Sequence, residues 1–228
     1  MSKHLVREIE KLKKMILGLA AVVELSVDRA VKAIERRDVR LAQTVLDGDP
    51  EIDHLEVDVE EECLKLLALN QPVANDLRFL VAVLKINNDL ERIGDLAVNI
   101  AERAVFLAEK PRPEPELNFA IMEQKAQSML RRSLDSLINH DSALAREVCV
   151  ADDEVDALHR KMCEDIVAAC HQHPLHLDSL VHLLGVSRHL ERIADHATNI
   201  AEDVIYMIEG EIVRHRPEDF RPPSKPKA

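Results

Sequence analysis

The sequence predicts an all-α protein made of two tandem three-helix bundles, and three observations lead to this fold class. Apolar residues recur every three or four positions along most of the chain, as in helices that are buried along one side. The 228 residues include only 5 Gly, 1 Tyr, 4 Phe and no Trp, so the aromatic residues typical of β-sheets are nearly absent. The second half of the sequence repeats the first, which indicates a duplicated unit.

The first unit, residues 1–108, is expected to contain three helices. The first has an apolar stripe that starts at Leu5 and ends at Ile34. Its stretch Met15–Val23 is apolar on more than one side, so we expect it to contact the other half of the chain or a second subunit.

Polar residues and prolines mark the other helix ends of this unit. Asp38 can cap the second helix, and Pro50 interrupts that helix. The helix either kinks at Pro50, or it ends near residues 47–48 and restarts with Asp49 as its N-cap. Gln71 and Pro72 end it, and Asp76 can cap the third helix.

Alternating prolines divide the two units. Residues 109–116 contain three of them and are predicted to form a linker, because proline interrupts helices. The second three-helix unit is expected over residues 117–215. Residues 216–228 are rich in Pro and Lys, and we expect them to form a disordered tail.

The internal repeat is most evident in two segments. Leu90–Glu102 recurs one hundred residues later as Leu190–Glu202, with nearly the same sequence. Upstream, Asp49–Leu55 matches Asp152–Leu158 at an offset of 103 residues. The short connections within each unit predict antiparallel packing of its helices.

Charge and cysteine content exclude several classes of protein. The formal net charge of −12 opposes binding to nucleic acid, which requires a basic surface. The four Cys residues lack CxxC spacing, so we expect free thiols. The apolar run Met15–Val23 is far shorter than the roughly 20 residues of a membrane span, and a cytoplasmic protein is predicted.

Paired carboxylates are the polar feature that recurs in the repeat. Each unit has one pair on its second helix and one on its third, and each pair is spaced four residues apart, on one helix face. Such oxygen ligands suit hard divalent cations or iron, and zinc if His196 or His54 takes part. The sequence predicts one metal site at Asp49, Asp53, Glu91 and Asp95, and another at Asp152, Asp156, Glu191 and Asp195.

Other interpretations of these residues stay open. The pairs also fit a solvated acidic face, although we expect Arg92 and Arg192 to pair with other helices. A carboxylate-bridged oxidase or hydrolase is the alternative function, but neither unit is expected to carry the Glu-x-x-His signature of di-iron bundles. The histidine-rich segment 171–176 suits zinc or nickel, and a solvated loop is the preferred interpretation. A P-loop, GxSxG and HExxH are all absent, so we do not expect an enzyme.

The chain resembles the PhoU family at the segments Gln71–Arg78, Leu90–Glu102 and Leu190–Glu202. The resemblance implies two three-helix bundles, a homodimer, and a cytoplasmic negative regulator of phosphate-starvation signalling that also regulates phosphate uptake. It implies an adaptor between the ATPase subunit of the phosphate ABC transporter and a phosphate-sensing histidine kinase, associated with the membrane only through these partners. It also implies metal clusters, of iron, zinc or another divalent cation, on the four carboxylate pairs. Pro50, and Leu96 in place of His196, are departures that predict weaker binding at the first site.

Overall fold

The computed structural model describes residues 3–113 and 117–213, and in these residues every regular element is a helix. The first unit contains α1 (Lys3–Arg36), α2 (Val39–Leu46), α3 (Asp49–Asn70) and α4 (Ala74–Ala108). The second contains α5 (Ala120–Asn139), α6 (Ser142–Gln172), a 3₁₀ turn η1 (Pro174–His176) and α7 (Leu177–Glu209). The expected all-α fold with two three-helix units is therefore confirmed, and one of its six predicted helices is divided into α2 and α3.

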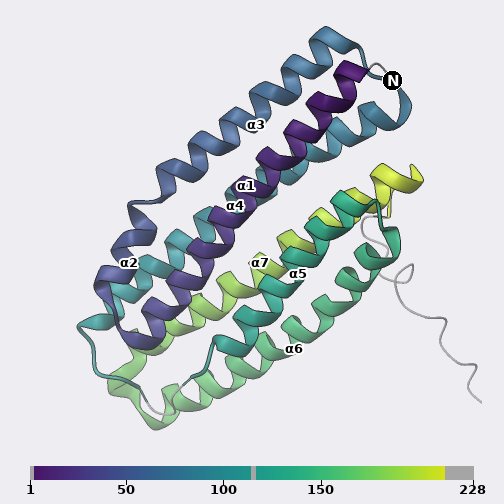
Figure 1. The fold of residues 1–228 in the computed structure, drawn as a ribbon. Helices are drawn as coiled ribbons and strands as arrows, with labels where there is room; N and C mark the ends of the chain where they lie inside the picture. The colour runs from purple at the N-terminus through teal and green to yellow at the C-terminus, as the bar shows by residue number, and fades with distance from the viewer. Residues whose placement is uncertain (1–2, 114–116, 214–228) are drawn as a thin grey trace, which may run out of the picture.

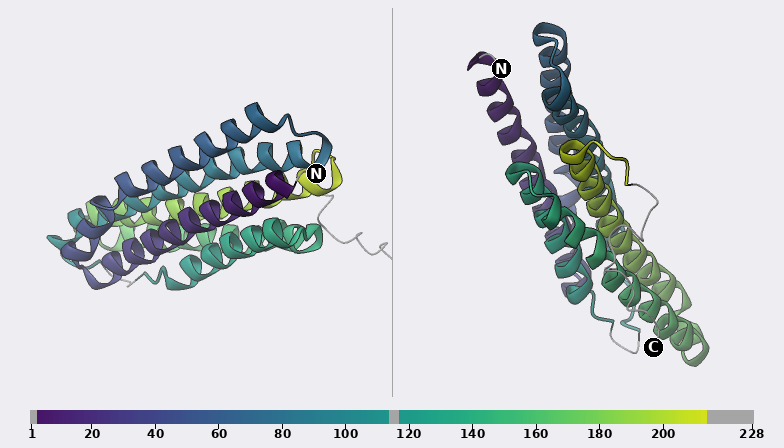
Figure 2. Two further views of the ribbon diagram at one scale, coloured as in Figure 1. Left: turned by 45° about the horizontal axis from the view of Figure 1, so that its top comes forward. Right: turned by 90° about the vertical axis from the view of Figure 1, so that its right-hand side faces the viewer.

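The long helices run along one common axis, and α4 and α7 form the centre of the molecule (Figures 1 and 2). In the first unit, α1 and α3 pack on α4, and in the second unit α5 and α6 pack on α7. The central pair is antiparallel, so the start of α7 lies beside the end of α4 (Figure 1). We call the contact between α4 and α7 the seam.

Buried aliphatic side chains form most of the core. Fully buried residues of α4 and α7 include repeat-related pairs, among them Leu90 with Leu190 and Ile93 with Ile193. Alanines at positions 97, 101, 197 and 201 are also fully buried, and small side chains let two helices approach closely. The seam therefore joins the two units into one continuous hydrophobic core.

Helix α1 contacts both units, as the broad apolar stretch predicts. Ile16, Leu19 and Val23 are fully buried. Farther along the helix, the Glu24 side chain forms an ion pair with Arg131 of α5. The contact to the other half of the chain is thus confirmed.

The second predicted helix of each unit differs in one respect, because it is divided in the first unit and continuous in the second. Asp38 and Asp141, 103 residues apart, cap α2 and α6 by accepting hydrogen bonds from backbone N–H groups. Helix α6 then continues without a break, whereas the first unit breaks between α2 and α3 beside Pro50. The alternative in which the helix ends and restarts near Pro50 is confirmed, but the prediction of Asp49 as the N-cap is wrong. Gly48 already has helical dihedral angles and takes that position, so Asp49 is the first residue of α3.

The predicted start of the third helix is also wrong. Gln71 ends α3 in a left-handed conformation, as a helix C-cap commonly does. Val73 is extended and precedes the first residue of α4, so the helix begins two residues before Asp76. Asp76 lies instead in the first turn, where its negative charge interacts favourably with the helix dipole.

The remaining expectations about the chain have mixed outcomes. Helix α4 ends at Ala108 and α5 begins at Ala120. Residues 114–116 of the expected linker and the expected disordered tail lie outside the described residues.

All four cysteines are free thiols, as expected. Within the described part of the chain, no helix has the length and apolar character that crossing a bilayer requires.

We predict that Leu190→Ala and Leu90→Ala each lower the free energy of unfolding by about 2–5 kcal/mol, because both side chains are fully buried and the truncation leaves a cavity. Urea denaturation measures this change. Leu64→Ala is the control, because Leu64 is 53% exposed, and its effect should stay within about 0.5 kcal/mol. Equal effects of the three variants would contradict a core centred on the seam.

Candidate functional site

The four carboxylate pairs lie on two acidic faces, one for each unit. The first face is formed by α3 and α4, and the second by α6 and α7, and in each case the two helices pack side by side. The four residues of each predicted site are partly or fully exposed. The apolar half of the repeated motif is buried in the core, so helical periodicity places its carboxylates on the outside.

The first acidic face brings the predicted residues close enough to affect one another. Burial, followed by the charges of Asp53 and Asp95, raises the pKa of Asp49. Burial and the charge of Asp95 raise the pKa of Glu91, and Asp53 and Glu56 contribute further. The charges of α3 and α4 residues therefore act on one another at the first acidic face.

The second acidic face is more strongly perturbed. Burial, followed by the charges of Asp195 and Asp156, raises the pKa of Asp152 to about 7. Burial also raises the pKa of Asp195, with Asp156 as the next cause, and that of Glu191, with Asp195 as the next cause. The charges of these carboxylates thus act on one another, and burial disfavours the ionisation of Asp152, Glu191 and Asp195.

The ion-pair partners of Arg92 differ from the expectation. Arg92 pairs with Asp95 at 3.0 Å and with Glu91 at 3.3 Å, both on its own helix. The prediction that Arg92 pairs with another helix is therefore wrong. Residues three apart are neighbours on a helix surface, and a long flexible side chain also reaches back to the adjacent residue.

The hydrogen-bond contacts of His196 and His54 are not with the eight predicted ligands. The Nδ1 atom of His196 lies 2.8 Å from Asp89 Oδ1, on the seam between the units. His54 contacts the carbonyl oxygen of Pro50 through Nδ1, and its side chain is exposed. Glu51 and His54 form a Glu-x-x-His sequence, so the expectation that neither unit carries one is wrong for the first unit, although both side chains are exposed to solvent. His196 still acts on Asp195 through its charge, whereas the equivalent Leu96 carries none, so this position does distinguish the two faces.

Sequence reasoning missed two residues beside the second face. The charge of His159 acts on both Glu191 and Asp195. Cys163 Sγ lies 3.6 Å from His159 Nε2. Both follow Asp156 on the same side of α6, at three and seven residues, so helical spacing could have revealed them. At the offset of 103 residues the first unit has Glu56 and Glu60 instead. The first face thus offers oxygen ligands alone, and the second adds nitrogen and sulfur.

The chemistry of both faces suits cations, because clustered carboxylates with raised pKa values favour a neighbouring positive charge. In the described residues, however, no three or more His, Cys, Asp or Glu side chains converge in a way that could hold a metal ion. The same holds for the histidine-rich segment 171–176, where the structure shows no metal-holding group in the described residues. His171 is exposed, and the rings of His173 and His176 are 6.1 Å apart.

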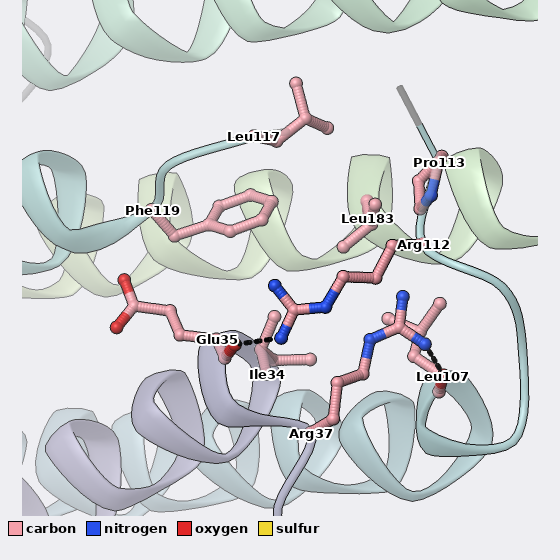
Figure 3. A pocket seen from close by; sticks show the side chains of 9 residues that line it. All are labelled: Ile34, Glu35, Arg37, Leu107, Arg112, Pro113, Leu117, Phe119 and Leu183. Atoms are coloured by element: carbon pink, nitrogen blue, oxygen red, sulfur yellow. Dashed lines mark hydrogen bonds between the residues drawn. The ribbon is translucent and has the colours of Figure 1, made fainter. Parts of the chain in front are cut away.

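A small cavity of about 50 Å³ lies where the first unit meets α7 (Figure 3). Two guanidinium groups point into it from Arg37 and Arg112. Arg37 donates hydrogen bonds to the carbonyl oxygens of Leu107 and Lys110, and Arg112 donates to that of Glu35 at 3.1 Å. These carbonyls lie at the ends of α4 and α1, where cations stabilise the helix dipole, so the two arginines have a structural role.

Comparison with known proteins identifies the same two units. The family model described as the PhoU domain matches residues 16–104 and again residues 119–204. A protein of Aquifex aeolicus named phosphate-specific transport system accessory protein PhoU homolog is 42% identical over 212 residues, which are 93% of this chain and 96% of the relative. A protein of the same name from Pseudomonas aeruginosa is 36% identical over 91% of this chain and 86% of its own length.

Solved structures agree with this assignment. The crystal structure of PhoU from Pseudomonas aeruginosa superposes with a TM-score of 0.85 at 35% identity, covering 90% of this chain and 99% of that one. The phosphate transport system regulatory protein PhoU from Streptococcus pneumoniae gives a TM-score of 0.82 at 27% identity, with 92% and 99% covered. The similarity thus extends over both units and the seam.

We predict that Asp152→Asn stabilises the protein in the presence of a chelator, and more at pH 8 than at pH 4. In the folded state the pKa of Asp152 is raised to about 7 from the ordinary value of 3.8. As the pH rises between these values, only the unfolded chain loses this proton, so the folded parent loses stability. Asn cannot ionise, and the gain at pH 8 should be about 1 kcal/mol, reduced by solvent screening.

Urea denaturation at several pH values measures this dependence. Asp153→Asn is the control, because Asp153 is the exposed neighbour. If both variants showed the same change between pH 4 and pH 8, the pKa of Asp152 would not be raised in the folded state.

Proposed function

This chain belongs to the PhoU family, and on that basis we propose that it regulates phosphate uptake and acts as a negative regulator of phosphate-starvation signalling. The observation that carries the proposal is the match of both units to relatives named as accessory proteins of phosphate-specific transport. The proposed role is that of an adaptor without enzymatic activity, located in the cytoplasm. Its partners are the ATPase subunit of the phosphate transporter and a phosphate-sensing histidine kinase.

The two ends of the molecule support an adaptor with two contact surfaces. Leu69 is 73% exposed and Val73 74% exposed at the connection between α3 and α4. Leu175 is 97% exposed in the turn between α6 and α7. These connections lie at opposite ends of the bundle (Figure 1). Large exposed apolar side chains favour protein contacts, so each end offers a surface for one partner.

A metal-dependent oxidase or hydrolase is the weaker alternative. Such an enzyme needs a substrate cavity beside its metal ligands. The groove between α1 and α3 is lined by Lys11, Glu62 and their neighbours, and the cavity on the seam by Lys85 and Asp89, not by the eight predicted ligands. We therefore assign the acidic faces to binding rather than to turnover.

We include metal binding at both acidic faces in the proposal. The clustered carboxylates repel one another, and a cation would remove that repulsion and stabilise the folded state by mass action. Side chains on an exposed face change rotamer easily, so the ligands can converge on an ion when it binds. The first face suits manganese, magnesium or iron through oxygen ligands, whereas His159 and Cys163 make the second more suitable for zinc.

Homodimerisation remains a part of the proposal, which analytical ultracentrifugation tests.

We predict that each face accounts for a separate part of the bound metal. Glu91→Ala with Asp95→Ala should remove binding at the first face, and Glu191→Ala with Asp195→Ala at the second. Protein dialysed against equal manganese and zinc should retain a higher ratio of zinc to manganese when the first face is removed. Elemental analysis measures the metal content, and each double variant is the matched control for the other.

Circular dichroism should show unchanged helix content in both double variants, since these side chains are exposed or partly exposed. A double variant with the metal content of the parent would show that its face is merely solvated.

We predict that deleting the gene switches on phosphate-starvation genes while phosphate is plentiful. Leu175→Asp and the pair Leu69→Asp with Val73→Asp should each fail to restore repression, because a charge opposes apolar docking. A pull-down from membranes should show the loss of a different partner for each variant. Reporter assays measure the repression.

Val57→Asp is the control, because Val57 is 46% exposed but lies on α3, away from both ends. It should restore repression as well as the parent. A deletion strain that keeps the starvation genes silent would refute the regulatory function, and docking variants that retain both partners would refute the two-ended adaptor.

A further inference from the structure

Three basic or hydrogen-bonding side chains meet at one end of the seam, and we call Arg103, His182 and His189 the seam cluster. Arg103 lies on α4 against Gly185 of α7, where a Cβ atom would come within 2.9 Å of the guanidinium carbon. His182 and His189 lie three residues before and four residues after Gly185, on the same helix face. The guanidinium therefore lies between the two histidine positions, over the place where any other residue would carry its Cβ atom.

The seam cluster contains nitrogen atoms without hydrogen-bond partners. In the described residues, this holds for Nε of Arg103, Nδ1 of His182 and both ring nitrogens of His189, all of which are buried atoms. The His182 ring stacks on Phe106, one turn beyond Arg103, with 3.8 Å between ring centroids. Buried polar atoms in folded proteins are nearly always bonded, so these nitrogen atoms are available to bind a further molecule.

The charges around the seam cluster are mostly positive, although the whole chain carries −12. The groups that act on His189 are Arg103, Arg192 and Arg188. Those that act on His182 are Arg103, Lys110 and one carboxylate, Asp178. Arg37 and Arg112 lie nearby, in the cavity that Leu183 also lines (Figure 3).

The internal repeat provides a comparison for this end of the seam. One hundred residues away, the positions equivalent to Gly185, His189 and Arg103 are Lys85, Asp89 and Asp203. There, Lys85 forms an ion pair with Asp203 at 3.1 Å, and Asp89 Oδ1 lies 2.8 Å from His196 Nδ1. The lysine at that end is thus balanced by a carboxylate of the protein, whereas within the described residues no ion pair is formed by Arg103.

We propose that the seam cluster binds a small tetrahedral oxyanion, inorganic phosphate. An arginine fork and imidazole N–H groups donate hydrogen bonds to phosphate oxygens, and the fixed charge of Arg103 repels a metal ion from the same place. The preference for an oxyanion comes from the geometry alone. The choice of phosphate over sulfate rests on the proposed function.

Isothermal titration calorimetry of the full chain with inorganic phosphate, in the presence of a chelator, tests the proposal. The chelator prevents phosphate from binding through metal ions on the acidic faces. The parent should bind one phosphate, and Arg103→Met should weaken binding by about tenfold or more, as expected for loss of a charged hydrogen bond. Gly185→Ala keeps every charge but displaces the guanidinium, and it should also weaken binding. Arg132→Met is the control, since Arg132 pairs with Glu147 on the α5–α6 side.

A second measurement does not depend on whether the variants fold. In NMR spectra of the parent, the ring signals of His182 and His189 should shift during the phosphate titration, and those of exposed His54 should not. Absence of binding by the parent, or unchanged binding in Arg103→Met, would overturn the site. Equal binding of sulfate would retain the oxyanion site but overturn its assignment to phosphate. The regulatory function would stand in either case, because the deletion strain tests it separately.

Discussion

The packing of α4 against α7 is the contact on which the rest of this structure depends. Both helices are buried along one side by leucine, isoleucine and alanine, and all other helices pack around them. The repeated motif Leu-Glu-Arg-Ile therefore has two functions. Its apolar residues hold the units together, and its carboxylates necessarily point away, towards α3 or α6. A change in the seam would thus also change the orientation of the acidic faces.

Duplication supplies the framework, and the differences between the copies supply chemistry that only one unit has. Glu56 and Glu60 of the first unit correspond to His159 and Cys163 of the second, which gives the two faces different ligand atoms. Pro50 breaks the first unit where α6 continues. Along the seam, Lys85 is replaced by Gly185, and Asp203 corresponds to Arg103. Each of these substitutions changes the charge or the backbone, while repeat-related pairs such as Leu90 with Leu190 and Ile93 with Ile193 remain the same.

Most of the fold could be predicted from the sequence because it depends on local periodicity. The apolar stripes, the cap at Asp38 and the end of a helix at Gln71 are properties of neighbouring residues, and the structure confirms them. The start of α4 could not be placed, because an aspartate in the first turn and one at the N-cap look alike in sequence.

The acidic faces could be predicted in part, since the carboxylate pairs recur in the sequence. Arg92 was misassigned because the reach of its flexible side chain depends on its rotamer. The contact between His196 and Asp89 and the seam cluster depend on the register of α4 against α7, which side-chain packing sets. Sequence periodicity shows which side of a helix is buried, but not which residue of another helix lies opposite.

The free thiols have a consequence for the oxidation chemistry of this protein. Burial, followed by nearby carboxylates, raises the pKa of Cys63 and of Cys149 to about 12, so at pH 7 only about one molecule in 100,000 carries a thiolate at either position. Burial and Glu191 also raise the pKa of Cys163. Since peroxides and disulfides react with the thiolate, the same negative charge that can attract cations protects these cysteines from oxidants. A cation bound at the second face would change the charge around Cys163, and the reactivity of that thiol would then report on occupancy.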